Sequence, residues 1–149
     1  MTKPATIPEV ISMRMPSRLE LLGILDHVAL SICERLEFDN EAASQVSMSV
    51  IEAGTNAIQH GHKRDASIPV DIEFMLFADR LEVQVHDTGP GFDPVGMNGD
   101  ATSPEHLLDA RGRGIFIMKA CMDSVTFDFS KGGTVCHLVK RRPPPTATG

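Results

Sequence analysis

The order of helix-patterned and strand-patterned segments restricts the fold of this chain more than any other feature. Apolar residues recur at helical spacing over residues 17–36 and again from Asp39 to about residue 60. Two alternating segments, 70–76 and 81–85, then predict a hairpin with one face on a core. Another helical segment and two more strands complete the order. The sequence therefore predicts an α+β fold, a two-layer sandwich of one mixed β-sheet with helices on one face.

Local signals predict where the first elements begin and end. Residues 7–15 alternate loosely and stop at Pro16, as an edge strand would. Ser17 with Glu20 three residues later forms a capping-box pattern, which predicts the start of the first helix. Asp39 is suited to cap the second helix, and Gly61 suits a left-handed position just after its end.

The second half of the chain contains a long segment rich in glycine and proline. Residues 87–111 predict an ordered loop or a mobile lid, with one short helix starting at Ser103. A helix follows Gly112, and strands at 125–129 and 134–140 are joined by a glycine turn. We expect a flexible N-terminus at 1–6, one domain at 7–140 and a disordered tail at 141–149.

Composition excludes several function classes. The chain has 149 residues, enough for one domain with its own core, and a net charge of −6 that argues against a nucleic-acid partner. No long apolar run predicts a membrane span or a secretory signal. The three cysteines lack metal-ligand spacing and predict buried, reduced thiols in a cytoplasmic protein: Cys33, Cys121 and Cys136.

Two histidines, His60 and His62, flank Gly61 and raise the question of a zinc site. No further cluster of ligands accompanies them, so exposed histidines at a helix end are the favoured interpretation.

A carboxylate and a carboxamide lie four residues apart on the second predicted helix. Glu52 and Asn56 therefore share one helix face. Such a pair can hold a hard cation through oxygen, and Glu52 can instead accept a proton from an attacking hydroxyl. The alternative is a solvated polar face with a weak local pair.

An acidic residue ends the predicted strand 81–85 and enters a glycine turn. Asp87 can accept a hydrogen bond from an exocyclic amine such as that of adenine. Gly89 and Gly91 would let the backbone approach a flat base or phosphates closely. An ordinary turn is the alternative, because aspartate and glycine dominate turns.

A second glycine turn, Gly112-Arg113-Gly114, is predicted to open the third helix. Free N–H groups and the positive end of the helix dipole would suit a phosphate. Arg111 and Arg113 would add charge and forked donors. The alternative is the end of a flexible lid with surface arginines.

In this order the three motifs resemble those of the GHKL ATPases, which include gyrase B, Hsp90, MutL and histidine kinase catalytic domains. Residues 52–56 resemble the N box, 87–91 the first glycine box and 112–114 the second. Gly133-Thr134 is similar to the late Gly-Thr pair of that superfamily, whose threonine supports the adenine site.

Within the superfamily the chain resembles the anti-sigma factor serine-protein kinases. Residues 52–61 read EAGTNAIQHG, similar to their Glu-Ala-x-x-Asn-Ala-x-x-His-Gly, and residues 114–118 with 122–123 are similar to theirs as well. The resemblance implies the Bergerat ATP-binding fold over 7–140, an ATP–Mg²⁺ site and often a homodimer. It also implies transfer of the ATP γ-phosphate to a serine of an anti-anti-sigma (STAS-type) partner, and sequestration of a sigma factor.

The resemblance assigns a role to each motif residue. Asn56 would ligate Mg²⁺, Glu52 would be the general base and Asp87 would bind the adenine amine. Gly89 and Gly91 would shape the base pocket. Thr134 would support the adenine site. The phosphates would be contacted by Arg111, Gly112, Arg113 and Gly114. Arg113 stands where these kinases often have an apolar residue, so a phosphate contact and a solvent-facing side chain both stay open.

The sequence favours three other functions less. A histidine-kinase-type catalytic domain is disfavoured because His27, after Asp26 in the first helix, lacks the proline expected downstream. An ATP-binding partner-switching regulator without kinase activity would not require Glu52. An ATPase of the gyrase or Hsp90 kind would be expected to have a transducer domain.

Overall fold

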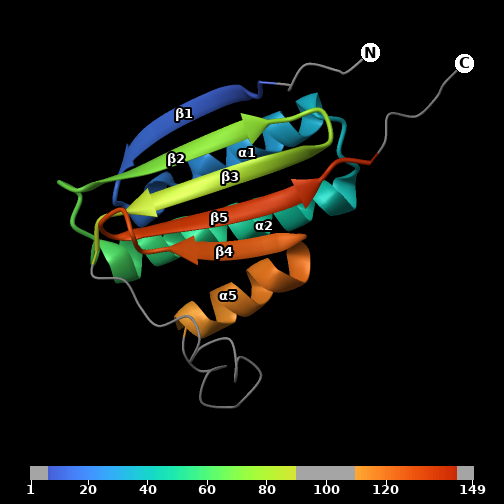
Figure 1. Cartoon of the computed structure of the whole chain (residues 1–149). Helices are drawn as coiled ribbons and strands as arrows, with labels where there is room; N and C mark the ends of the chain where they lie inside the picture. Colours follow the sequence, from blue (N-terminus) through green and yellow to red (C-terminus); the bar gives the residue numbers. More distant parts are fainter. Residues whose placement is uncertain (1–6, 90–109, 144–149) are drawn as a thin grey trace, which may run out of the picture.

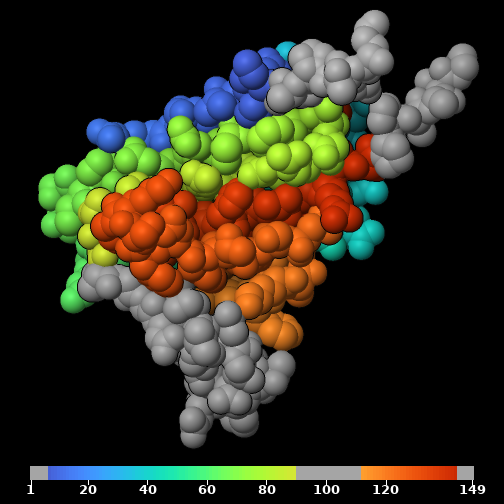
Figure 2. All heavy atoms as spheres, in the orientation of Figure 1, coloured from blue at the N-terminus to red at the C-terminus, as the bar shows by residue number. Residues whose placement is uncertain are grey.

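One face of a five-stranded sheet is covered by helices in the computed structural model, which describes residues 7–89 and 110–143 (Figure 1). The strands are β1 (Glu9–Pro16), β2 (Pro69–Leu76), β3 (Arg80–Asp87), β4 (Ser124–Asp128) and β5 (Thr134–Arg141). Their order across the sheet is β1-β2-β3-β5-β4. In Figure 2 the atoms of the five strands follow one another across the near face. In Figure 1, which has the same orientation, the described helices lie behind or below the sheet.

In the part of the chain that the structure describes, the helical layer consists of three longer helices and two short helical turns. These are η1 (Leu19–Leu21), α1 (Leu22–Arg35), α2 (Asn40–Asn56), η2 (Ala57–Gly61, a π-helical turn) and α5 (Ala110–Cys121). Within the described ranges, none of the helices combines the length and apolarity needed to cross a membrane.

The predicted two-layer α+β sandwich is confirmed, with one difference in the sheet. Every described strand pair is antiparallel, whereas the prediction was a mixed sheet. The reason lies in the connections: each neighbouring pair is either a hairpin or is reached by a crossover that returns the chain in the opposite direction. As predicted, β1 lies at an edge.

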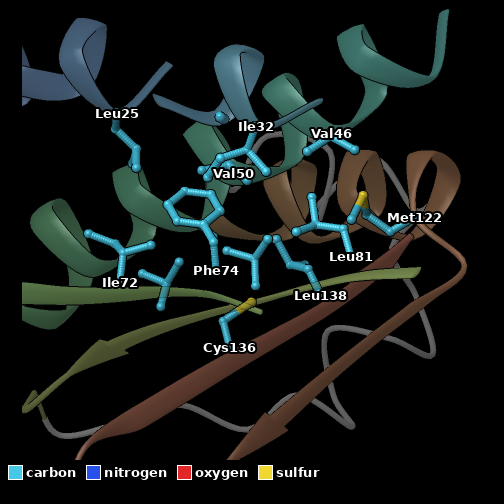
Figure 3. Close-up of a cluster of buried hydrophobic side chains, with 14 of the residues drawn as sticks. Leu25, Ile32, Val46, Val50, Ile72, Phe74, Leu81, Met122, Cys136 and Leu138 are labelled. Carbon is cyan, nitrogen blue, oxygen red and sulfur yellow. The ribbon is translucent and has the colours of Figure 1, made fainter. Parts of the chain in front are cut away.

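The core fills the space between the helices and the sheet (Figure 3). Strict alternation in β2 and β3 places every second side chain on the helix side. In the registered pairs Ile72 faces Val85 and Phe74 faces Val83, and α2 contributes Val46 and Val50 from above. The same alternation continues two residues beyond Val85 and brings the carboxylate of Asp87 to this face.

The start of α2 confirms its predicted cap, but the start of the first helix does not. Asp39 accepts a hydrogen bond from the Ala42 N–H at 2.8 Å. Ser17 makes no cap: its hydroxyl donates to the Ile68 carbonyl at 2.6 Å, and Glu20 pairs with Arg18 instead. The capping-box prediction was wrong because a buried long-range bond took the serine away from the helix.

Gly61 does not occupy the predicted left-handed position at the helix end. It is the last residue of η2, and the residues with positive φ that follow are Lys63 at 51° and Arg64 at 61°. A Cβ on Gly61 would lie 2.5 Å from the carboxyl carbon of Asp87. This glycine is therefore explained by a close approach between segments and not by its own backbone angle.

The sheet continues past the predicted domain boundary at residue 140. Arg141 belongs to β5, and Arg142 donates from its guanidinium to the carbonyls of Leu36 and Phe77. The predicted lid and the short helix at Ser103 lie almost wholly outside the described residues, and the tail is described only to residue 143.

The three cysteines are free thiols, but the prediction that all of them are buried was wrong for Cys121. Cys33 and Cys136 are buried, and Cys121 is partly exposed. Burial raises the pKa of Cys33 to about 11 and that of Cys136 to about 12, so both stay protonated near neutral pH.

Candidate functional site

The carboxylate of Asp87 lies at the end of the core-facing side of β3. Only 6% of this residue is exposed. It is registered opposite Thr134 on β5, which is also buried. An acidic and a hydroxyl side chain are thus placed together at one end of the sheet, on the side that the helices cover.

Three glycines surround the turn that follows Asp87. A Cβ on Gly61 would meet the Asp87 carboxyl group, and one on Gly89 would meet the Gly61 backbone. A Cβ on Gly133 would overlap the Asp87 carbonyl and would lie 2.6 Å from the Thr88 Cα. The turn is therefore held between η2 and the β4–β5 hairpin, with no room for a side chain at the contacts.

The two hairpin glycines supply a matched test of this packing. Gly132 and Gly133 both have positive φ, 72° and 93°, but a Cβ on Gly132 would meet nothing within 4 Å. Alanine at either position should cost about 1–2 kcal/mol of backbone strain. We expect Gly133→Ala to cost roughly 1–3 kcal/mol more, because it also overpacks the Asp87 turn. Denaturant unfolding measures both, and equal losses would contradict the close contact.

A hollow opens beside Asp87 between α2 and the sheet. Its walls are mostly apolar, with polar groups from three elements, and the lining consists of Ala53, Asn56, Ala57, Val85, Asp87, Phe127, Thr134 and Cys136. Small residues on α2 and an aromatic ring on β4 suit a flat ring system. The carboxylate and the hydroxyl would then fix its orientation by hydrogen bonds.

A second hollow adjoins the first, because Asn56 lines both. The other residues around it are polar or charged in the main: Glu52, Thr55, Gln59, Arg113 and Ile117. The two hollows therefore share Asn56: one is apolar with a carboxylate, and the other is polar with a guanidinium. A ligand with a flat apolar end and an anionic end would match this pair of hollows.

At Gly114, helix α5 packs closely against the residues of α2 that line the second hollow. A Cβ at Gly114 would lie 2.7 Å from Glu52 Oε2 and 3.5 Å from Asn56 Nδ2. The absence of a side chain thus lets α5 pack against the polar face of α2. The predicted face shared by Glu52 and Asn56 is borne out in this respect: both side chains are half-buried beside α5.

Burial and a neighbouring charge act on Glu52 in opposite directions. Loss of solvent raises the pKa of its carboxyl group, and the positive charge of Arg113 lowers it to a lesser extent. A half-buried carboxylate with a raised pKa is a stronger proton acceptor than an ordinary glutamate. Such a group next to a polar hollow is a candidate general base.

The second glycine motif lies within a helix and does not form a turn before one. The described part of α5 begins at Ala110, so Gly112 and Gly114 are helical and buried, and the Arg113 side chain is exposed. Arg113 is near enough to act on the Glu52 carboxylate. Gly91 lies outside the described residues, and Arg111 is described only as part of the α5 backbone.

His60 and His62 belong to no cluster of metal ligands among the described residues. Among the described residues, no group of three histidine, cysteine or acidic side chains could hold a metal ion. His62 was expected to be exposed but is buried, with ring nitrogens bonded to Ser17 and Thr88. The exposure prediction was wrong because the ring packs between two segments distant in the sequence.

Sequence reasoning missed several residues that shape the site. Ala53 and Phe127 line the first hollow, and Gly61 meets Asp87. The only signal for the two lining residues was their place on the core faces of α2 and β4. Nothing in the local sequence indicated that His62 would reach Thr88.

Comparison with known proteins gives a consistent family. Residues 15–140 match the family described as the histidine kinase-like ATPase domain. Serine-protein kinase RsbW of Bacillus licheniformis is 33% identical over 134 residues, covering 85% of this chain and 82% of the relative. The protein of the same name from Bacillus subtilis (strain 168) is 33% identical over 132 residues, with the same coverage. That from Listeria monocytogenes serovar 1/2a is 29% identical over 141 residues, covering 88% and 87%.

Proposed function

This chain belongs to the histidine kinase-like ATPase family, and we propose that it is an anti-sigma factor with serine-protein kinase activity. It uses ATP and transfers the γ-phosphate to a serine of a protein partner. The observation that carries the proposal is the pair of hollows that share Asn56, one lined by Asp87 and the other by Glu52.

The adenine ring would occupy the first hollow, whose walls would have to move apart to admit it, because the hollow is smaller than the base. Asp87 would accept a hydrogen bond from the exocyclic amine, Thr134 would support it, and Ala53 and Phe127 would contact the ring faces. Gly89 and Gly91 would keep the backbone beside the base free of side chains. The buried position of Asp87 makes its hydrogen bond strong, because little water competes for it.

The second hollow fits the phosphates. Arg113 lines it and would neutralise phosphate charge, and Gly114, which has no side chain, lets α5 lie close to Glu52 there. Arg111 would add a second cation. In phosphoryl transfer, positioning and charge neutralisation supply most of the catalysis.

Asn56 fits the role of a magnesium ligand. Its side chain lines both hollows and therefore lies between the two ends of the proposed nucleotide. Mg²⁺ in such sites is held by one or two protein oxygens together with phosphates and water, so a large cluster of acidic ligands is not required. The ion would offset the negative charge of the phosphates, and Asn56 would help to hold it.

Glu52 would act on the acceptor serine. As its hydroxyl oxygen bonds to the γ-phosphorus, the bond to the β–γ bridging oxygen breaks and ADP leaves. The hydroxyl proton passes to the Glu52 carboxylate. The half-buried position of Glu52 beside the second hollow places a proton acceptor where this reaction needs one.

The partners follow from the same proposal. The acceptor would be an anti-anti-sigma protein of the STAS type, and the regulated partner a sigma factor. A homodimer is also proposed, from family resemblance. The buried free thiols Cys33 and Cys136 fit the reducing cytoplasm in which these partners would act.

The proposal is tested by incubating the purified chain with γ-labelled ATP and STAS-type proteins encoded near its gene, with and without Mg²⁺. We expect label on a serine of one partner, and none after chelation of the metal. ATP binding without label on any of these partners would favour the partner-switching regulator. Label on a histidine of the chain itself would favour the histidine-kinase type. Failure to bind ATP would reject the proposal.

A further inference from the structure

His62 connects two distant segments through its ring. It is 4% exposed and immediately follows the η2 turn. Its Nδ1 lies 2.9 Å from the hydroxyl of Ser17, just after β1. Its Nε2 lies 2.8 Å from the backbone nitrogen of Thr88, just after β3. No role for this residue follows from the transfer reaction described above.

The surrounding bonds fix which ring nitrogen carries the proton. The Ser17 hydroxyl has one hydrogen, and it is donated to the Ile68 carbonyl at 2.6 Å. Ser17 must therefore accept from His62, so Nδ1 carries the hydrogen. Nε2 then has a free lone pair, which accepts the Thr88 N–H. These bonds select the arrangement in which Nδ1 donates and Nε2 accepts.

This acceptor acts at the point where the chain leaves the sheet for the nucleotide site. Thr88 directly follows Asp87, and the next N–H, that of Gly89, donates to Asp87 Oδ1 at 2.9 Å. Two successive backbone N–H groups are thus fixed, one by the imidazole and one by the Asp87 side chain. Together they define how the carboxylate is presented to the first hollow.

We propose that His62 is a positioning residue for nucleotide binding, whose Nε2 holds the Thr88 backbone so that Asp87 presents its carboxylate to the adenine ring. This inference rests on the proposed function. It adds a residue that touches neither the base nor the phosphates and acts through the turn. The Ser17 bond matters because it selects the tautomer with the free Nε2.

Two conservative substitutions separate this role from simple packing. In His62→Gln the side-chain oxygen can take the place of Nε2 and accept the Thr88 N–H. In His62→Asn the shorter amide can reach only the Ser17 side. Both variants remove the same buried ring, so both should lower the melting temperature. We expect ATP affinity to stay within about threefold of the wild type in His62→Gln, and to fall at least about tenfold in His62→Asn, the loss of one well-placed hydrogen bond.

The experiment measures the Kd for ATP by calorimetric titration and the melting temperature of each nucleotide-free protein. Equal ATP affinities for the two variants would overturn the proposal, whatever their stabilities. If neither variant folds, Ser17→Ala decides: a weaker Kd for ATP supports the selected tautomer, and an unchanged Kd overturns it. If the wild-type protein binds no ATP, the proposed function is rejected. This outcome is distinct from equal ATP affinities of the two variants, which reject only the role of His62.

Discussion

Glu52→Gln is expected to lower the rate of phosphoryl transfer by about 10²–10⁴-fold, the usual contribution of a general base, while ATP binding is retained. Glutamine preserves the shape of the side chain beside Gly114, so the packing of α5 on α2 should survive. Only the ability to accept the serine proton is lost. Single-turnover transfer to the protein substrate and a separate ATP titration measure the two effects.

A matched control lies on the same helix. Glu41 is exposed in the first turn of α2, so Glu41→Gln removes an equal charge far from the hollows. Its transfer rate should equal that of the wild type. Unchanged transfer in Glu52→Gln would reject Glu52 as the base, and equal losses in both variants would point to a general charge effect.

The raised pKa of Glu52 gives the transfer rate a predictable pH dependence. Because burial raises this pKa, the rate should begin to fall at a higher pH on acidification than an ordinary glutamate would allow. Arg113 lowers the pKa, so Arg113→Ala should move the acid limb to still higher pH. Rate–pH profiles of the two proteins measure the shift, and a shift toward lower pH in Arg113→Ala would contradict the arrangement.

The same pKa shift has a consequence for stability. A carboxyl group whose pKa is raised on folding binds its proton more tightly in the folded state. The free energy of unfolding therefore decreases as pH rises through the window between the ordinary and the raised pKa. Glu52→Gln removes this effect, so the variant should be more stable than the wild type at neutral pH, which thermal unfolding would show.

The regular elements could be predicted from the sequence because their signals are local. Alternation in β2 and β3 gave the hairpin and its buried face, and Asp39 gave the start of α2. The position of Asp87 at the end of this strand was predicted as well, and the structure adds that it continues the core-facing series of β3. The shared face of Glu52 and Asn56 followed from helical periodicity.

The remaining features depend on contacts between distant segments, which local patterns do not encode. Ser17 has the sequence of a helix cap but bonds to Ile68 and His62. Gly61 has the sequence of a helix end but is required by the Asp87 carboxyl group. In both cases a buried tertiary contact outweighed a local propensity worth about 1 kcal/mol.

Asp87→Asn is expected to weaken ATP binding by about 10–100-fold and to affect GTP binding far less. The preference for ATP over GTP would therefore become smaller. The magnitude corresponds to roughly 1.5–3 kcal/mol for a hydrogen bond to a charged acceptor. Adenine offers an amine at the position where guanine has a carbonyl oxygen. A carboxylate therefore accepts from adenine and repels guanine, whereas the Asn amide can donate to guanine.

Asparagine is the informative substitution because it preserves the turn. Its Oδ1 can still accept the Gly89 N–H, so the backbone after β3 should keep its path. Asp87→Ala would lose this bond as well. Because Asp87 is only 6% exposed, the substitution would also leave a void. Paired titrations with ATP and GTP on wild type and Asp87→Asn measure the preference directly. If the two affinities fell by the same factor, Asp87 would serve the shape of the turn and not the reading of the base, and the first hollow would lose its assignment to adenine.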